Sequence, residues 1–61
     1  MTYQETIIWH KYPDEKPDGL SESMYLIQHK EIGVTDMWWI DDIWEWDDEN
    51  IIAWADMPKG I

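Results

Sequence analysis

The segment IGVTDMWWIDDIWEW, residues 32–46, decides the fold class of this chain. Its first part alternates side chains with a period of two, which is the pattern of a β-strand. One face of this predicted strand carries Ile32, Val34, Trp38 and Ile40, and the other carries Thr35, Met37 and Trp39. Asp36 interrupts the first face, which indicates a β-bulge or an edge position.

The second part of the segment predicts a turn and a short partner strand. Asp41-Asp42 fits a two-residue turn, and residues 43–46 form a strand with Trp44 and Trp46 on one face. A helix over residues 36–49 is the alternative. Its face would mix Trp38 with Asp42, Glu45 and Glu49, and a mixture of apolar and acidic side chains at helical spacing argues against it.

Shorter apolar runs on either side predict the remaining strands, at residues 7–9, 24–29 and 51–55, with tight connections at residues 30–31 and 47–50. Residues 12–19 contain Pro13, Pro17 and Gly19 and predict a loop. Residues 20–23 fit either one short helical turn or a continuation of that loop. We therefore expect a mainly β, single-domain fold over residues 1–61, an antiparallel meander of four to five short strands.

The chain is strongly acidic. Fourteen acids against four lysines and no arginine give its 61 residues a formal charge of −10. The stretch from Asp36 to Asp56 holds eight carboxylates and five of the six tryptophans but no basic residue. Nucleic acid and anionic membranes reward positive charge, so they are poor partners, whereas a basic protein surface is a good one.

Nothing in the sequence predicts an enzyme or a cofactor site. The acidic segment lacks the glycine and the ligand spacing of a calcium loop, so we expect no metal site. His10 and His29 have no supporting catalytic pattern, and we expect them to be structural. No apolar run approaches a membrane span, and the residues at the start lack the blocks of a signal peptide, so we expect a soluble protein of the bacterial cytoplasm.

The six tryptophans exceed what so small a core needs. We expect Trp9, Trp38 and Trp54 to fill the core. The others, Trp39, Trp44 and Trp46, are expected to be exposed as interface anchors, because tryptophan is enriched at binding hot spots.

Several short motifs resemble those of a known family. They are Trp9 with Tyr12-Pro13-Asp14-Glu15, the pair Trp38-Trp39, and Trp54-Ala55-Asp56-Met57-Pro58. Together they resemble the small phage and prophage proteins of domain-of-unknown-function family 551. The chain departs from that family at Tyr12, where leucine is usual, and at Ala55-Asp56. The resemblance implies a mainly β mini-domain of phage origin and supplies no catalytic residues.

These observations lead to two functional hypotheses. In the first, the chain is a phage-derived inhibitor that mimics nucleic acid and binds the basic surface of a host nucleic-acid-binding protein, such as a restriction or CRISPR nuclease, a repair enzyme or a polymerase. The predicted contact residues are Asp36, Asp41, Asp42, Trp44, Glu45, Trp46, Asp47, Asp48 and Glu49. In the second, it is an accessory β-domain that self-associates, as a homodimer or larger, through its tryptophans and uses its acids for solubility.

Overall fold

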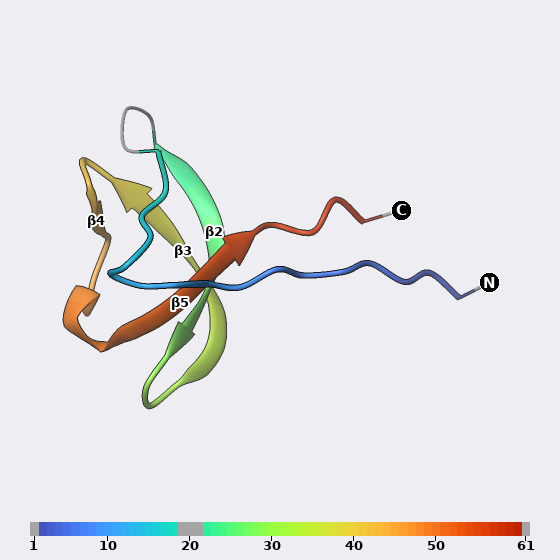
Figure 1. The fold of residues 1–61 in the computed structure, drawn as a ribbon, viewed down its shortest axis with the longest axis horizontal. Helices are drawn as coiled ribbons and strands as arrows, with labels where there is room; N and C mark the ends of the chain where they lie inside the picture. The colour runs from blue at the N-terminus through green and yellow to red at the C-terminus, as the bar shows by residue number, and fades with distance from the viewer. Residues whose placement is uncertain (1, 19–21, 61) are drawn as a thin grey trace.

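The computed structural model describes residues 2–18 and 22–60, which form one curled antiparallel sheet (Figure 1). Its elements are β1 (His10–Lys11), β2 (Ser23–His29), β3 (Gly33–Ile40), β4 (Ile43–Trp44), the 3-10 turn η1 (Asp48–Asn50) and β5 (Ile51–Asp56). The strand order is β1-β5-β2-β3-β4, and every neighbouring pair is antiparallel. The predicted mainly β fold is confirmed. Strands β2, β3 and β4 pair consecutively as a meander, and β5 then returns to lie between β1 and β2.

The predicted turn at Asp41-Asp42 is present. Ile40 pairs with Ile43, and the φ angles of Asp41 and Asp42 are 52° and 67°. Two positive φ angles are what a tight two-residue hairpin turn requires, and aspartate tolerates this region better than most residues. The turn therefore forms without the glycine that usually occupies it.

Two of the expected strands differ from the observed ones by more than one residue, and the helix alternative is wrong. Residues 2–9 have no regular secondary structure, and Ile8 is 69% exposed. The strand expected at 7–9 is therefore absent, and β1 begins directly after it, at His10. Strand β4 ends at Trp44 rather than at residue 46. The segment in which a helix was considered forms β3 and β4. Of the possible helical turn at 20–23, residues 20 and 21 lie outside the described part of the chain, and Ser23 begins β2.

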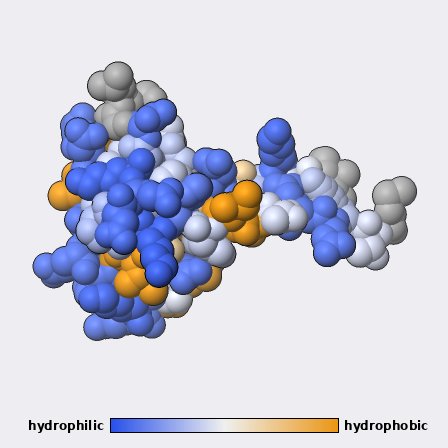
Figure 2. Space-filling model, in the orientation of Figure 1, coloured by the Kyte–Doolittle hydropathy of each residue, from blue (hydrophilic) through white to orange (hydrophobic). Residues whose placement is uncertain are grey.

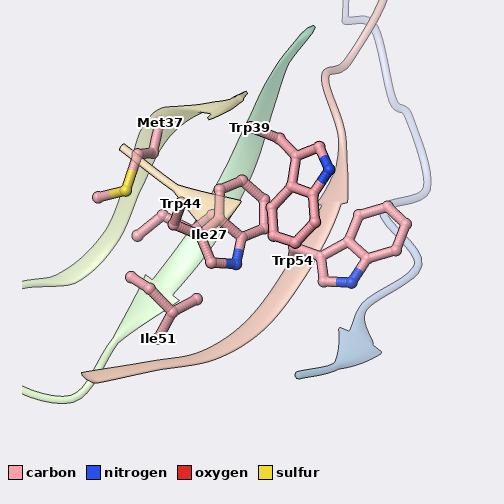
Figure 3. Packing of buried hydrophobic residues seen from close by; sticks show 6 residues of the cluster. All are labelled: Ile27, Met37, Trp39, Trp44, Ile51 and Trp54. Atoms are coloured by element: carbon pink, nitrogen blue, oxygen red, sulfur yellow. The ribbon is translucent and has the colours of Figure 1, made fainter. Parts of the chain in front are cut away.

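The core lies on the concave face of the sheet (Figure 3). It consists of Ile27, Met37, Trp39, Trp44, Ile51 and Trp54, with Tyr12 and Tyr25 packed against it. The rings meet edge to face: Trp39 and Trp44 lie 4.9 Å apart at 71°, and Tyr25 and Trp54 lie 5.1 Å apart at 70°. Such geometry stabilises aromatic pairs beyond the area they bury.

The structure corrects the division of the tryptophans. Trp39 and Trp44 are 0% and 1% exposed, whereas Trp38 is 39% exposed. Trp39 and Trp44 are therefore core residues and cannot anchor a partner, while Trp38 lies on the outer face. The expectation that Trp54 is buried and Trp46 exposed is correct, and Trp9 is half-buried. Trp38 and Trp39 were expected on the wrong faces because both faces of β3 carry large apolar side chains. Alternation alone therefore does not show which face is buried.

Candidate functional site

The predicted acids gather along one edge of the sheet. Strand β4 is the edge strand, and the segment from Asp41 to Asn50, which includes β4 and η1, forms the left side of the molecule in Figure 1. This segment carries Asp41, Asp42, Glu45, Asp47, Asp48 and Glu49. Asp36 does not belong to this group, because it lies on the outer face in the middle of β3, opposite Leu26.

Asp48 has a structural role. Its Oδ1 atom accepts a hydrogen bond of 2.7 Å from the Tyr12 hydroxyl and one of 3.2 Å from the Trp44 backbone N–H. These contacts join the loop after β1 to the end of β4. Because the carboxylate is half-buried and already bonded, it is poorly placed to contact a partner.

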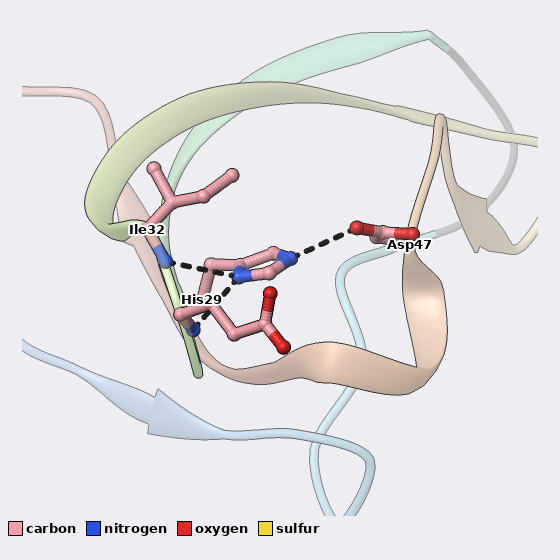
Figure 4. A network of polar contacts seen from close by, with 4 residues as sticks. His29, Ile32 and Asp47 are labelled. Carbon is pink, nitrogen blue, oxygen red and sulfur yellow. Dashed lines mark hydrogen bonds and ion pairs between the residues drawn. The ribbon is translucent and has the colours of Figure 1, made fainter.

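Asp47 also has a structural contact, with the buried residue His29 (Figure 4). The Nδ1 atom of His29 accepts hydrogen bonds from the backbone N–H groups of Glu31 and Ile32, at 3.0 and 3.2 Å. Since Nδ1 is an acceptor, the proton of the neutral ring is on Nε2, which donates to Asp47 Oδ2 at 3.1 Å. His29 therefore has a structural role, as expected, and it links the β2–β3 turn to η1.

The partly exposed ring of Trp46 lies beside the ring of His29. It lies 5.9 Å from the ring of His29, and 44% of the residue remains exposed. Of the two tryptophans among the predicted contact residues, Trp46 is accessible and Trp44 is not. Trp38, which was expected in the core, is also accessible.

Four carboxylates remain for an external role. We call Asp41, Asp42, Glu45 and Glu49 the acidic rim. All four are exposed, and within residues 2–18 and 22–60 their carboxylates make no hydrogen bond or ion pair. Mutual repulsion among such charges destabilises a compact state, and a cation brought by a partner would relieve it. In Figure 2 the visible face is largely hydrophilic, and its apolar residues form separate small patches.

A groove that the sequence did not reveal lies elsewhere on the molecule. It has a volume of about 500 Å³ and is lined by Trp9, Lys11, Tyr12, Asp14, Gln28, Ile52 and Ala53. These residues come from three separate segments, which only the β1–β5–β2 pairing brings together. No local pattern could have indicated it.

The described residues offer neither a metal centre nor a membrane-spanning helix. No three histidine or acidic side chains among residues 2–18 and 22–60 are grouped so that they could hold a metal ion. In the same part of the chain, no helix has the length and apolar character needed to cross a bilayer.

The fold and the site thus define a small antiparallel β domain with an aromatic core and an uncompensated acidic edge. Comparisons with protein families, with curated proteins and with solved structures found no match to this chain.

The contact between Tyr12 and Asp48 predicts a loss of stability at alkaline pH. Burial raises the pKa of the Tyr12 hydroxyl well above its usual value of 10.0, and the hydrogen bond and negative charge of Asp48 raise it further. Above pH 10 the unfolded chain releases this proton while the folded chain retains it, so the free energy of unfolding should fall as the pH rises. Urea unfolding between pH 8 and pH 11 should show this decline.

Tyr12→Phe should make the decline shallower, because the titrating group is gone, although it should also lower stability at neutral pH by removing the hydrogen bond to Asp48. Tyr3→Phe is the comparison: the hydrogen bond to Glu5 also raises the pKa of the Tyr3 hydroxyl, but the side chain is exposed, so its loss should change the slope less than Tyr12→Phe does. An equal alkaline slope in Tyr12→Phe and in the unmodified protein would contradict this explanation.

Proposed function

We propose that this protein is a small phage- or prophage-derived inhibitor that acts in the bacterial cytoplasm by occupying the nucleic-acid-binding surface of a host protein. The observation that carries the proposal is the acidic rim: four exposed carboxylates on one edge of the sheet, with no ion pair to any residue that the structure describes. Target classes that fit are a defence nuclease, a repair enzyme or a polymerase, because each presents a basic surface to phosphates. The protein needs no catalytic residue for this role.

The electrostatics support binding to a basic protein surface. Long-range attraction between the chain, with its formal charge of −10, and a basic groove would accelerate encounter. The hairpin turn and the 3-10 turn hold the backbone that carries most of the rim, so that backbone does not have to be ordered on binding, which lowers the entropic cost of taking the place of phosphates. Trp46 would add an aromatic contact beside them.

A rim variant tests the proposal without disturbing the fold. Asp41→Asn/Asp42→Asn/Glu45→Gln/Glu49→Gln removes four charges but keeps Asp47 and Asp48, which hold the structure. Asparagine also accepts the positive φ of the hairpin turn. Bait made from the unmodified protein should capture a host protein from bacterial lysate at low salt and release it at high salt, and added DNA or RNA should compete with the bait.

The rim variant should bind the purified target at least about tenfold more weakly, a loss of about 1.4 kcal/mol. The matched control is Asp14→Asn/Asp18→Asn/Glu31→Gln/Asp56→Asn, which removes the same number of charges at exposed positions outside the acidic rim. If both variants lose affinity equally, net charge alone explains binding. If neither does, the mimicry proposal is wrong.

The exposed tryptophans favour a second function, an accessory β-domain that self-associates. Trp38 and Trp46 are 39% and 44% exposed. Sedimentation at several concentrations separates the two functions. A dimer dissociated by Trp38→Ala or Trp46→Ala, and unaffected by the rim variant, would favour self-association.

A further inference from the structure

Strand β3 has a neighbour on only one side along most of its length. β2 pairs with β3 from Gly33 to Trp39, whereas β4 pairs only with Trp39 and Ile40. One further contact extends β4, a hydrogen bond of 3.1 Å from the Glu45 N–H to the Trp38 carbonyl. Before Trp38, no described segment pairs with the outer edge of β3.

The backbone groups at this edge point outward. The bond from Glu45 shows that the Trp38 carbonyl faces away from β2. Because alternate residues of a strand direct their N–H and C=O groups to the same side, those of Val34 and Asp36 face away from β2 as well. Neither residue's backbone bonds to a described segment beyond the β2–β3 ladder. Such a row of unpaired donors and acceptors is a template for an added strand.

The side chains along this edge indicate what such a strand must carry. Val34, Asp36 and Trp38 project from the same outer face, because Cβ atoms alternate along a strand. Val34 is 59% exposed and Trp38 39%, and Asp36 is exposed between them without an ion pair to any described residue. A carboxylate beside an indole suits a guanidinium, which would form an ion pair with the former and a cation–π contact with the latter.

A second copy of this chain does not fit the edge. Antiparallel pairing of two β3 strands centred on Asp36 would place the two carboxylates opposite each other, and directly opposed like charges destabilise a strand pair. Each copy would also bring its formal charge of −10. Asp36 therefore discriminates against self-pairing and in favour of a basic strand.

We propose that the outer edge of β3 binds an extended segment of a partner protein as an added antiparallel strand, with an arginine opposite Asp36 and an apolar residue opposite Val34. In antiparallel pairing the arginine precedes the apolar residue by two positions. The inference shares with the proposed function only the basic character of the partner, and it does not require the acidic rim.

The probe is the synthetic peptide acetyl-Arg-Thr-Val-Thr-Thr-amide, which pairs only with the part of β3 before Trp38 and is added to the ¹⁵N-labelled full chain. The backbone N–H signals of Val34 and Asp36 should shift on titration, and their hydrogen exchange should slow at least about tenfold at saturation. A peptide with glutamate in place of arginine should fail to bind. So should a peptide methylated on the arginine backbone nitrogen, because it keeps the side chains but loses the hydrogen bond to the Asp36 carbonyl.

Protein variants separate this inference from the proposed function. Asp36→Lys should reverse the preference toward the glutamate peptide, whereas the rim variant should bind the arginine peptide normally. The inference is overturned if millimolar peptide leaves the β3 signals unchanged, if the methylated peptide binds equally well, or if Asp36→Lys does not alter the preference. Loss of the captured host protein in the rim variant would still support the proposed function in each of those cases.

Discussion

Trp39→Ala should destabilise the domain severely, whereas Trp38→Ala, one residue earlier, should have only a small effect. Trp39 is fully buried and packs edge to face against Trp44 and Tyr12. Replacing a buried tryptophan by alanine costs about 3–5 kcal/mol. At the typical stability per residue, a chain of this size has a free energy of unfolding of only about 3–9 kcal/mol. The cavity left by Trp39 would therefore remove a large part of it.

Urea unfolding followed by circular dichroism measures the difference. Trp38→Ala is a demanding control because it removes the same side chain from the adjacent position. Since Trp38 is 39% exposed on the outer face, its loss should lower the free energy of unfolding by only about 1 kcal/mol. Similar midpoints for the two variants would show that the concave face is not the principal core.

The same pair of residues shows how far sequence reasoning extends. Period-two alternation in residues 32–40 predicted β3, and two acids between apolar runs predicted the β3–β4 turn, because both signals are local. The choice of buried face is not local. Val34, Trp38 and Ile40 make one face as apolar as the other, and the exposed charge of Asp36 was the available sign that this face points outward. Asp36 was correctly expected at an edge or a bulge, and it lies on an edge.

The sequence predicted which segment carries the candidate site, but not which of its acids are free to contact a partner. The segment 41–49 does lie along one edge, but its acids divide into two kinds through contacts with distant residues. Tyr12 bonds to Asp48 across 36 positions, and His29 bonds to Asp47 across 18. No pattern within the segment distinguishes these two structural acids from the four of the rim. The return of β5 between β1 and β2 is likewise a long-range choice.

His29→Ala should be the second most damaging substitution and should act through hydrogen bonds more than through volume. The residue is 3% exposed, and its ring is the acceptor for the Glu31 and Ile32 N–H groups of the β2–β3 turn. Glu31 and Ile32 are exposed, so water can partly replace the lost acceptor. Each lost hydrogen bond then costs about 0.5–1.5 kcal/mol, and the cavity left by the ring adds to this. We expect a loss of about 2–4 kcal/mol in the free energy of unfolding, with faster hydrogen exchange of the Glu31 and Ile32 amides.

Two comparisons identify which part of the network matters. Asp47→Asn keeps an oxygen acceptor for the Nε2–H of His29 and tolerates the φ of 49° at this position, so it should cost less than about 1 kcal/mol. His29→Gln can present one side-chain oxygen to the turn and should recover part of what His29→Ala loses. If Asp47→Asn proves as damaging as His29→Ala, the hydrogen bond to the charged carboxylate of Asp47 holds η1 in place. If His29→Ala alone is severe, acceptance of the two backbone N–H groups fixes the β2–β3 turn and, with it, the start of the exposed β3 edge.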